Sequence, residues 1–374
     1  MSARWGALVA IACLLAGCGA LTLPTGDAGV DAGSGGGNGG GGTTGGGTGG
    51  GDGTGGGGGT GGGGGTGGGG GTGGGSGGQL TFANLSVDQG STSGVVAISG
   101  SAAELWALAE DGAVFRSTGG AFAKVAQIAV SQRGLFAVDG QVFAGGRYGT
   151  NHCVSNCTDD ASYVYTSSPS FTEGVTVCGA SITQVYAVFV STSATPGTSV
   201  SRWSGSAWTN VTSSLPITNP SSCAVDPNGT VWVAGNNGVA QYANGAGSFE
   251  RIGSDTWHYT SVFTIGAEVH VAGDGHRLAR RAPGSPPQWV VLEDPRVSDA
   301  LDAIGGPAAT ALFAGGRSSG TKKNWYRWNG SVWSNAAENL QGMDSVWAVF
   351  ATGPSEVYFG GNLGNAPAIV RATW

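Results

Sequence analysis

Residues 327–333 read RWNGSVW and residues 202–208 read RWSGSAW, so the two heptapeptides agree at five of seven positions. They begin 125 residues apart, which is three periods of about 42 residues. A second landmark has the same period and consists of an aliphatic residue followed by an aromatic residue or, once, by His. It occurs seven times, at Leu105-Trp106, Val142-Phe143, Val185-Tyr186, Val231-Trp232, Val269-His270, Leu312-Phe313 and Val357-Tyr358.

Each repeat has the pattern of short strands. Runs rich in Val, Phe, Tyr and Trp alternate with Gly, Ser, Asn and Pro, and no amphipathic helical stretch of useful length occurs. Seven repeats of four strands each predict an all-β fold, a seven-bladed β-propeller over residues 79–374. A pair of β-sandwiches or a β-solenoid is the alternative.

The last repeat predicts how the ring closes. It offers strands at 345–350, 356–361 and 368–374, and a fourth strand is missing. The segment LTFANLSV (80–87) has the pattern of a strand but precedes the first repeat. We therefore expect residues 80–87 to pair beside 368–374, because this pairing closes the ring and removes an exposed edge.

The repeats resemble kelch-type propeller repeats, which carry a double glycine after the second strand, then a Tyr and a Trp. One repeat has the full set, Gly315-Gly316, Tyr326 and Trp333, while Gly145-Gly146 and Gly360-Gly361 are partial matches. The other four repeats lack the doublet. The resemblance implies a degenerate kelch-like propeller, and the repeat period indicates a propeller without it.

Residues 1–17 have the layout of a secretory signal peptide. Arg4 precedes an apolar run that ends at Leu15 and is too short to span a bilayer. The end of the segment, Leu15-Ala16-Gly17-Cys18, resembles the lipobox of bacterial lipoproteins. The resemblance implies cleavage before Cys18 and acylation of that cysteine by several chains such as palmitate, which anchor a protein stably in a membrane.

The localisation that follows is the cell envelope. Gly19, rather than Asp, follows the cysteine, and in relatives of Gram-negative bacteria this implies the outer membrane. The alternative is an ordinary cleaved signal peptide in which Cys18 has no role.

Residues 18–78 are predicted to be a disordered tether that begins at the lipidated cysteine. Residues 34–78 hold 34 glycines in 45 positions. Such a segment has no apolar side chains to bury, so it behaves as a flexible coil with a root-mean-square reach of about 40–45 Å. The tether separates the domain from the membrane.

The folded part has little charge, with 15 basic and 20 acidic side chains over residues 79–374. This mildly acidic balance gives no electrostatic basis for binding nucleic acid. The expected partners are the membrane, through the lipid anchor, and a protein or glycan ligand of unknown identity. We expect a monomeric domain.

Four cysteines lie in the folded part, and an even number in an exported domain indicates disulfides. Cys178 and Cys223 precede the landmark aromatics of their repeats by eight and nine residues. The propeller register therefore predicts a Cys178–Cys223 disulfide between adjacent blades and a Cys153–Cys157 disulfide within one loop. A zinc site of His152, Cys153 and Cys157 is the alternative, which an oxidising compartment disfavours.

No motif assigns chemistry to the chain. The nucleophile-elbow, zinc-protease, phosphate-loop and calcium-loop spacings are all missing, so we predict no catalytic residue, no metal and no cofactor. His270, Asp274 and His276 have the spacing of a small metal site, but a surface hairpin is the preferred interpretation. Four tryptophans at equivalent repeat positions form either a sugar-stacking platform or, as we prefer, part of the core: Trp203, Trp208, Trp328 and Trp333.

Binding residues are expected on loops. In a propeller the loops between second and third strands share one face, and variable loops on a rigid scaffold usually carry binding. The long ones are predicted at 147–161, 191–198, 317–324 and 362–367. The candidate residues of this ligand face are Arg147, Tyr148, His152, Arg317, Lys322 and Lys323.

Three functions are consistent with these features. The first is a lipid-anchored envelope protein that displays the propeller as a binding or scaffolding module. The second is a propeller enzyme that acts on polysaccharide as a glycosidase or lyase, and the third is a structural envelope component. Acidic, Arg and Tyr side chains that converge at the ring's centre favour the enzyme, whereas an apolar or Gly-lined centre favours binding.

Overall fold

The computed structural model describes residues 80–374 except 130, 168–170, 192–196, 255, 276, 283–286, 294–299, 319–323 and 336–339. All described residues belong to one compact unit, Gly71–Trp374. The signal peptide and the tether predicted over residues 1–78 lie outside the described residues, so both stay predictions.

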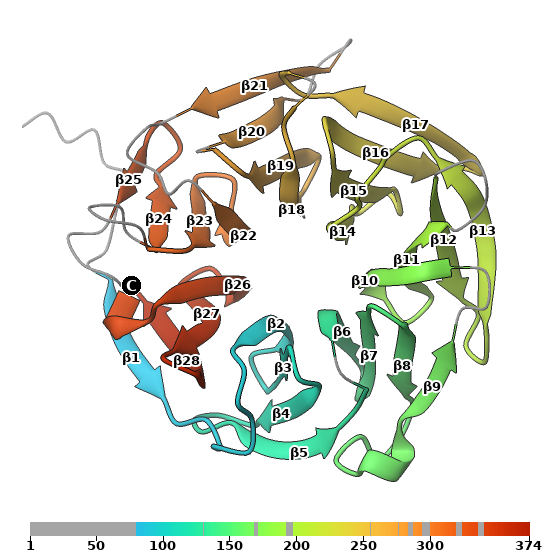
Figure 1. The fold of residues 1–374 in the computed structure, drawn as a ribbon. Coiled ribbons are helices and arrows are strands. Elements are labelled where there is room, and N and C mark those ends of the chain that lie inside the picture. The colour runs from blue at the N-terminus through green and yellow to red at the C-terminus, as the bar shows by residue number, and fades with distance from the viewer. Residues whose placement is uncertain are drawn as a thin grey trace, which may run out of the picture. The chain divides into compact units, whose positions relative to one another are not determined.

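The described strands form seven four-stranded antiparallel sheets, and these sheets stand in a ring around a central channel (Figure 1). The prediction of a seven-bladed β-propeller is confirmed. The described helices are two single 3-10 turns, η1 (Asp160–Ser162) and η2 (Leu340–Gly342). Within the described part of the chain, no helix has the length and apolar character needed to cross a membrane.

Each blade is a meander that starts at the channel and ends at the outer rim. The strands of the first four blades, from the channel outwards, are β2 (Val95–Ser101), β3 (Glu104–Ala109), β4 (Ala113–Ser117) and β5 (Ala123–Gln127); β6 (Gln132–Val138), β7 (Gln141–Gly146), β8 (Gly149–Cys153) and β9 (Val164–Ser167); β10 (Phe171–Ser181), β11 (Gln184–Ser191), β12 (Thr198–Trp203) and β13 (Trp208–Leu215); and β14 (Ser222–Val225), β15 (Val231–Gly235), β16 (Gly238–Ala243) and β17 (Ala246–Arg251).

The remaining three blades follow the same order, and the last one takes its outer strand from the start of the domain. Their strands are β18 (Tyr259–Ile265), β19 (Glu268–Gly273), β20 (Arg277–Ala282) and β21 (Gln288–Glu293); β22 (Leu301–Ala308), β23 (Ala311–Gly316), β24 (Trp325–Trp328) and β25 (Trp333–Asn335); and β26 (Ser345–Gly353), β27 (Glu356–Leu363), β28 (Ala366–Thr373) and β1 (Thr81–Leu85).

Closure of the ring by β1 is confirmed. This strand pairs antiparallel with β28, in a register that runs from Thr81 opposite Thr373 to Leu85 opposite Ile369. Phe82 adds an edge-on contact with Trp325 of blade 6, with ring centroids 5.2 Å apart. The segment after β1 then binds blade 1, because the Asp88 amide donates to the Phe122 carbonyl at 2.9 Å.

The core is divided among the seven junctions between blades, with one hydrophobic cluster at each. The landmark pair explains this division, because successive strand residues point to opposite faces of a sheet. In blade 1, Leu105 packs against blade 7 and Trp106 packs against blade 2. The pair recurs because every blade must contact two neighbours.

The repeated heptapeptides are hairpins between third and fourth strands. Trp203 pairs across its hairpin with Trp208, and Trp328 pairs with Trp333. Their ring centroids lie 5.4 and 5.5 Å apart, and all four side chains are buried or partly buried in junction clusters. The preference for core packing over a sugar-stacking platform is confirmed.

The glycine doublets have a packing reason. At Gly145, Gly315 and Gly360 an added Cβ would lie 2.8, 2.3 and 2.7 Å from the innermost strand of the next blade. Close approach of two sheets requires glycine at these positions. This packing accounts for the doublets without reference to one propeller family.

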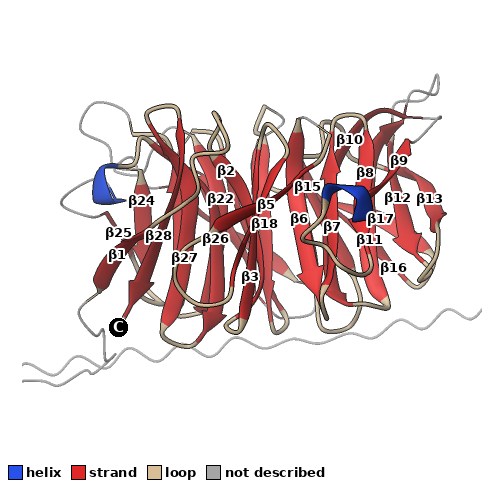
Figure 2. Cartoon of the chain, turned by 90° about the horizontal axis from the view of Figure 1, so that it is seen from below, coloured by secondary structure: helices blue, strands red, loops and turns tan. Residues whose placement is uncertain are grey.

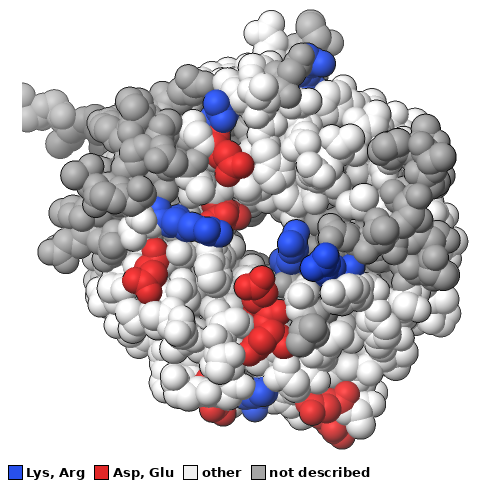
Figure 3. All heavy atoms as spheres, viewed as in Figure 1, with Lys and Arg blue, Asp and Glu red and all other residues white. Residues whose placement is uncertain are grey.

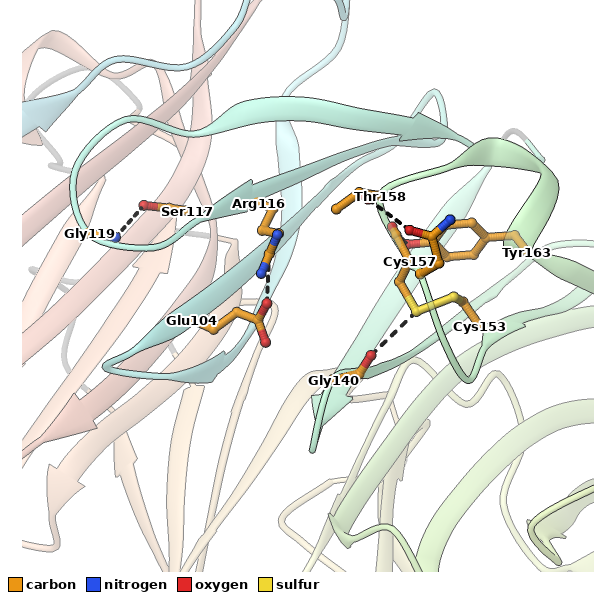
Figure 4. A network of polar contacts seen from close by, with 10 residues as sticks. Glu104, Arg116, Ser117, Gly119, Gly140, Cys153, Cys157, Thr158 and Tyr163 are labelled. Atoms are coloured by element: carbon orange, nitrogen blue, oxygen red, sulfur yellow. Dashed lines mark hydrogen bonds and ion pairs between the residues drawn. A yellow bond between two sulfur atoms is a disulfide. The ribbon is translucent and has the colours of Figure 1, made fainter.

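Both predicted disulfides are present. Cys178 of β10 is bonded to Cys223 of β14, with Cα atoms 5.7 Å apart, and joins blades 3 and 4. Cys153 is bonded to Cys157, with Cα atoms 5.6 Å apart, and closes the start of the β8–β9 loop (Figure 4). Because both cysteines of the second pair are oxidised, neither supplies the thiolate that the alternative zinc site requires.

Candidate functional site

A β-bulge lies near the start of the innermost strand in most blades. The register with the second strand skips one residue between Val95 and Ala97, and equivalent skips occur in five further blades. In blade 4, the Ser221 amide donates to the Ala234 carbonyl beside the Ser222–Ala234 pair, which is the same arrangement. A bulge turns the side chain of the extra residue away from the regular strand pattern.

The bulged residues with described side chains surround the channel. We call them the bulge ring, and all of them line the central cavity, whose volume is about 770 Å³. They are Val96, Arg133, Ser221, Thr260, Asp302 and Trp347.

The bulge ring lies on the face that carries the turns between second and third strands. Isolated bridges join three of these turns to residues at or just before the innermost strand of the next blade, as in Arg317 opposite Ser345. We call this the loop face and the opposite one the far face. The C-terminus belongs to the far face, because the Trp374 amide donates to the Ser355 carbonyl in the turn between β26 and β27 (Figure 2).

Two hydroxyls of the bulge ring tie neighbouring blades together. Ser221 Oγ lies 3.3 Å from the Ala234 carbonyl of its own blade and 2.6 Å from the Tyr259 carbonyl of the next. Thr260 Oγ1 contacts the Ala272 and Leu301 carbonyls in the equivalent way. The single donor proton of each of these hydroxyls is therefore used within the ring itself.

Asp302 is the acidic member of the bulge ring, and its side chain is 24% exposed. Its Oδ2 atom is buried without a hydrogen-bond partner and lies 3.8 Å from Nε of Arg317. Burial raises the pKa of Asp302 to about 6, against the opposing effect of Arg317, and the negative charge of Asp274 raises it further. The carboxylate is therefore poorly stabilised in its charged form.

Arg133 and Trp347 are the other members with distinctive chemistry. Arg133 is exposed and lines the cavity, and among the described residues it has no hydrogen bond or ion pair. Trp347 is half-buried, and its ring packs so closely on Gly94 that an added Cβ there would lie 2.3 Å from Cζ3. In Figure 3, which shows the loop face, basic and acidic side chains stand on both sides of the central opening.

The structure brings one predicted ligand-face residue to the bulge ring. Arg317 follows β23 on the loop face and reaches toward Asp302. Arg147 and Tyr148 lie in the turn between β7 and β8, also on the loop face, with the guanidinium 5.6 Å from the Tyr148 ring centroid. Tyr148 is 56% exposed. Lys322 and Lys323 lie outside the described residues.

The predicted loops at 147–161 and 362–367 are wrong in extent. Strand β8 occupies Gly149–Cys153, and β27 and β28 leave only a short turn between Leu363 and Ala366. His152 therefore lies within a sheet, where its ring centroid is 4.4 Å from that of Trp203 in blade 3, and burial lowers its pKa.

The short disulfide also lies on the other face from the one expected. The Cys157 sulfur is 3.4 Å from the carbonyl oxygen of Gly140, which lies in the turn between β6 and β7 on the far face (Figure 4). Arg147 and Tyr148 thus share no loop with this disulfide.

No group of three or more potential metal ligands occurs within the described part of the chain. His270 is buried in β19, and its Nε2 atom lies 3.1 Å from Glu268 Oε2. It occupies the landmark position that an aromatic residue fills in the other blades. His276 lies outside the described residues.

Arg133, Asp302 and Trp347 were not predicted from the sequence. All three lie near the start of their strands, and the residues next to Asp302 and Trp347 are apolar or small, whereas Arg133 follows Gln132. A charged residue at this repeated position is a usable signal, but only after the blades are aligned by their bulges.

No protein-family model and no curated protein sequence matches the chain. Solved structures share its fold. YCF48 bound to D1 peptide has a TM-score of 0.58 at 10% identity, covering 79% of this chain and 95% of that one. Virginiamycin B lyase from Staphylococcus aureus has a TM-score of 0.60 at 12% identity, with coverages of 79% and 99%.

A third similar structure is the extracellular domain of a putative hybrid two component system from B. thetaiotaomicron. Its TM-score is 0.58 at 14% identity, and the match covers 78% of this chain and 40% of that one. These similarities define the class of the protein as a β-propeller. The functions of the similar structures differ, so the fold alone assigns no activity.

Proposed function

We propose that the protein is a ligand-binding module of the bacterial cell envelope, and that it takes its ligand at the loop-face mouth of the propeller channel. The bulge ring carries this proposal. It combines an arginine without a described partner, a carboxylate with an unbonded oxygen and a half-buried tryptophan around one cavity. Polar groups that lack partners at the rim of a cavity are typical of binding sites.

The composition of the channel favours binding over catalysis. Below the bulge ring, the described lining consists of small, apolar and hydroxyl-bearing residues. The charged residues of the whole described lining are Arg133 and Asp302, both in the bulge ring. Glycosidases generally require two carboxyl groups that flank the scissile bond. The described lining supplies one.

The anchor is the second part of the proposal. The protein is held by lipid on Cys18, in the outer membrane of a Gram-negative cell, and residues 19–78 serve as its tether. Strand β1 begins opposite Thr373, near the far face, so the chain enters the propeller on the side opposite the bulge ring. This entry point is consistent with a loop face that is directed away from the membrane.

Binding is tested with the full chain on glycan arrays and peptide libraries. Trp347→Ala should abolish binding of the ligand found. Val332→Ala should leave it unchanged, because Val332 is an exposed residue in the β24–β25 turn on the far face. A site at the bulge ring is contradicted if both variants lose ligand affinity equally, or if neither variant changes it.

The anchor is tested by incorporation of labelled palmitate in cells. Cys18→Ser should abolish the label, and Cys13→Ser, which changes a cysteine inside the predicted signal, should retain it. Label that persists in Cys18→Ser contradicts the lipobox.

An enzyme acting on polysaccharide is the second candidate, and the pKa of Asp302 favours it. A carboxyl group with a pKa of about 6 is suited to general acid–base catalysis near neutral pH. The test is release of reducing or unsaturated sugar ends from envelope polysaccharide. Activity that Asp302→Asn removes supports the enzyme, while absence of both activity and binding leaves the structural component.

A further inference from the structure

We propose that the ligand of the bulge ring is a zwitterionic peptide, whose ammonium group binds Asp302 and whose carboxylate group binds Arg133. This inference rests on the proposed function, because it names the ligand class of the same channel mouth. It follows from the polar atoms of Asp302 and Arg133 that lack hydrogen-bond partners among the described residues and from the positions of these two residues around the channel.

The Oδ2 atom of Asp302 lacks a hydrogen-bond donor. The 3.8 Å between its Oδ2 atom and Arg317 Nε is too long for a hydrogen bond, and the same oxygen has no other partner. Asp274 adds a second negative charge that acts on this carboxyl group. An ammonium group brings up to three donors, so it supplies the hydrogen bonds that this carboxyl group lacks although the Arg317 guanidinium lies 3.8 Å away.

Arg133 lacks a hydrogen-bond acceptor among the described residues. Its guanidinium is exposed at the channel and makes no polar contact with any residue that the structure describes. A guanidinium binds a carboxylate through two parallel hydrogen bonds, which gives geometric specificity as well as attraction. A ligand carboxylate is therefore the expected partner of this side chain.

The two charges face each other across the opening. Arg133 belongs to β6 in blade 2 and Asp302 to β22 in blade 6, and these strands lie on opposite sides of the channel (Figure 1). A single ligand that binds both side chains must therefore carry both charges and span the mouth. The cavity of about 770 Å³ lies within the size range of ligand pockets in proteins.

Peptides fit this arrangement better than neutral glycans. A peptide with free termini has an ammonium and a carboxylate group separated by an extended chain, and Trp347 provides an aromatic surface between them on one side of the ring. A neutral glycan supplies hydroxyl groups but no charge, so it leaves Arg133 without a described counter-charge and leaves Asp302 with Arg317 alone. YCF48, which has this fold, has been solved with a bound peptide.

The test uses the full chain and three forms of one pentapeptide library: unmodified, N-acetylated and C-amidated. Affinity is read from calorimetry. We expect either modification to weaken binding at least tenfold. Asp302→Asn should remove the discrimination against the acetylated form and keep that against the amidated form, while Arg133→Gln should do the reverse.

Arg116→Gln is the control, because it removes a positive charge that is paired with Glu104 outside the channel lining. It should bind all three libraries as the unchanged protein does. Equal affinity for the three forms, or binding of none of them, overturns the peptide assignment. If a neutral glycan binds instead and Trp347→Ala abolishes that binding, the proposed function stands and this inference fails.

Discussion

The two disulfides should stabilise the protein unequally. Cys178 and Cys223 are separated by 45 residues in the sequence, whereas Cys153 and Cys157 are separated by 4. A disulfide restricts the unfolded chain more strongly when it closes a longer loop. The chain-entropy expression gives about 4 kcal/mol for the longer loop and about 2 kcal/mol for the shorter one.

The perturbation is the replacement of both cysteines of one pair by alanine, so that no unpaired thiol remains. Cys153 and Cys157 are 0% and 4% exposed and Cys178 is 7% exposed, while Cys223 is only partly buried, so the longer-loop pair loses no more packing than the shorter one. The difference of about 2 kcal/mol therefore comes from the loops.

The assay is urea unfolding of the full chain, followed by tryptophan fluorescence. The free energy of unfolding extrapolated to water should fall about twice as far for Cys178→Ala/Cys223→Ala as for Cys153→Ala/Cys157→Ala, and the slope should rise more for the longer loop, because its removal lets the unfolded chain expand. Equal losses of free energy, or a larger loss for the short loop, refute the reasoning, because the blade 3–blade 4 disulfide would then have no advantage over a local one.

Three further predictions concern charged groups. Asp302→Asn should raise the free energy of unfolding at pH 8 by up to about 3 kcal/mol and leave it unchanged at pH 4. The reason is that the folded-state pKa of Asp302 is raised to about 6, so ionisation of this group costs stability as pH rises. Denaturant titration at both pH values measures the difference. His270 has its pKa lowered by burial to about 4, so the protein should lose about 3 kcal/mol as pH falls from 6.5 to 4; His270→Tyr should flatten this loss in thermal melts. Glu250→Gln should lower the free energy of unfolding by about 3 kcal/mol, because the carboxylate accepts hydrogen bonds from Arg281 and Trp289 at 2.7 and 2.8 Å, and the Arg281 and Glu250 side chains are only 18% and 19% exposed. Glu104→Gln, which breaks a more exposed ion pair, should lower it by under about 1 kcal/mol. Equal losses in the two variants contradict the role of burial.

The fold was predictable because it depends on residues that recur. The aliphatic–aromatic pair is required at every junction, since one member packs against each neighbouring blade, as Leu105 and Trp106 show. The register of this pair also placed Cys178 and Cys223 on equivalent strands of adjacent blades, which fixed the disulfide. Ring closure followed from two observations: a strand precedes the first repeat, and the last repeat lacks its fourth strand.

The loop boundaries were less predictable because some strands lack an apolar pattern. β8 reads GTNHC, and Thr150 and Asn151 are 1% and 3% exposed. Polar residues between two blades contribute no periodic signal of the kind that identifies a strand. The sequence therefore assigned this strand to a loop, and with it His152 to the ligand face.

The bulge ring could not be derived from the sequence alone. A bulge is defined by pairing with the neighbouring strand, so Arg133 and Asp302 have the pattern of ordinary residues at the start of a strand. Their proximity to one channel depends on the ring of seven blades. The sequence did identify Arg317, because it lies in one of the predicted loops.

The most direct test of a charged peptide site is the titration of Asp302 itself, by the carboxyl ¹³C signal of labelled protein, with Asp302→Asn to assign the resonance. In the free protein the pKa should lie near 6. Saturation with the unmodified pentapeptide library should lower it, because a bound ammonium group stabilises the carboxylate. A pKa that stays the same while peptide is bound contradicts the account.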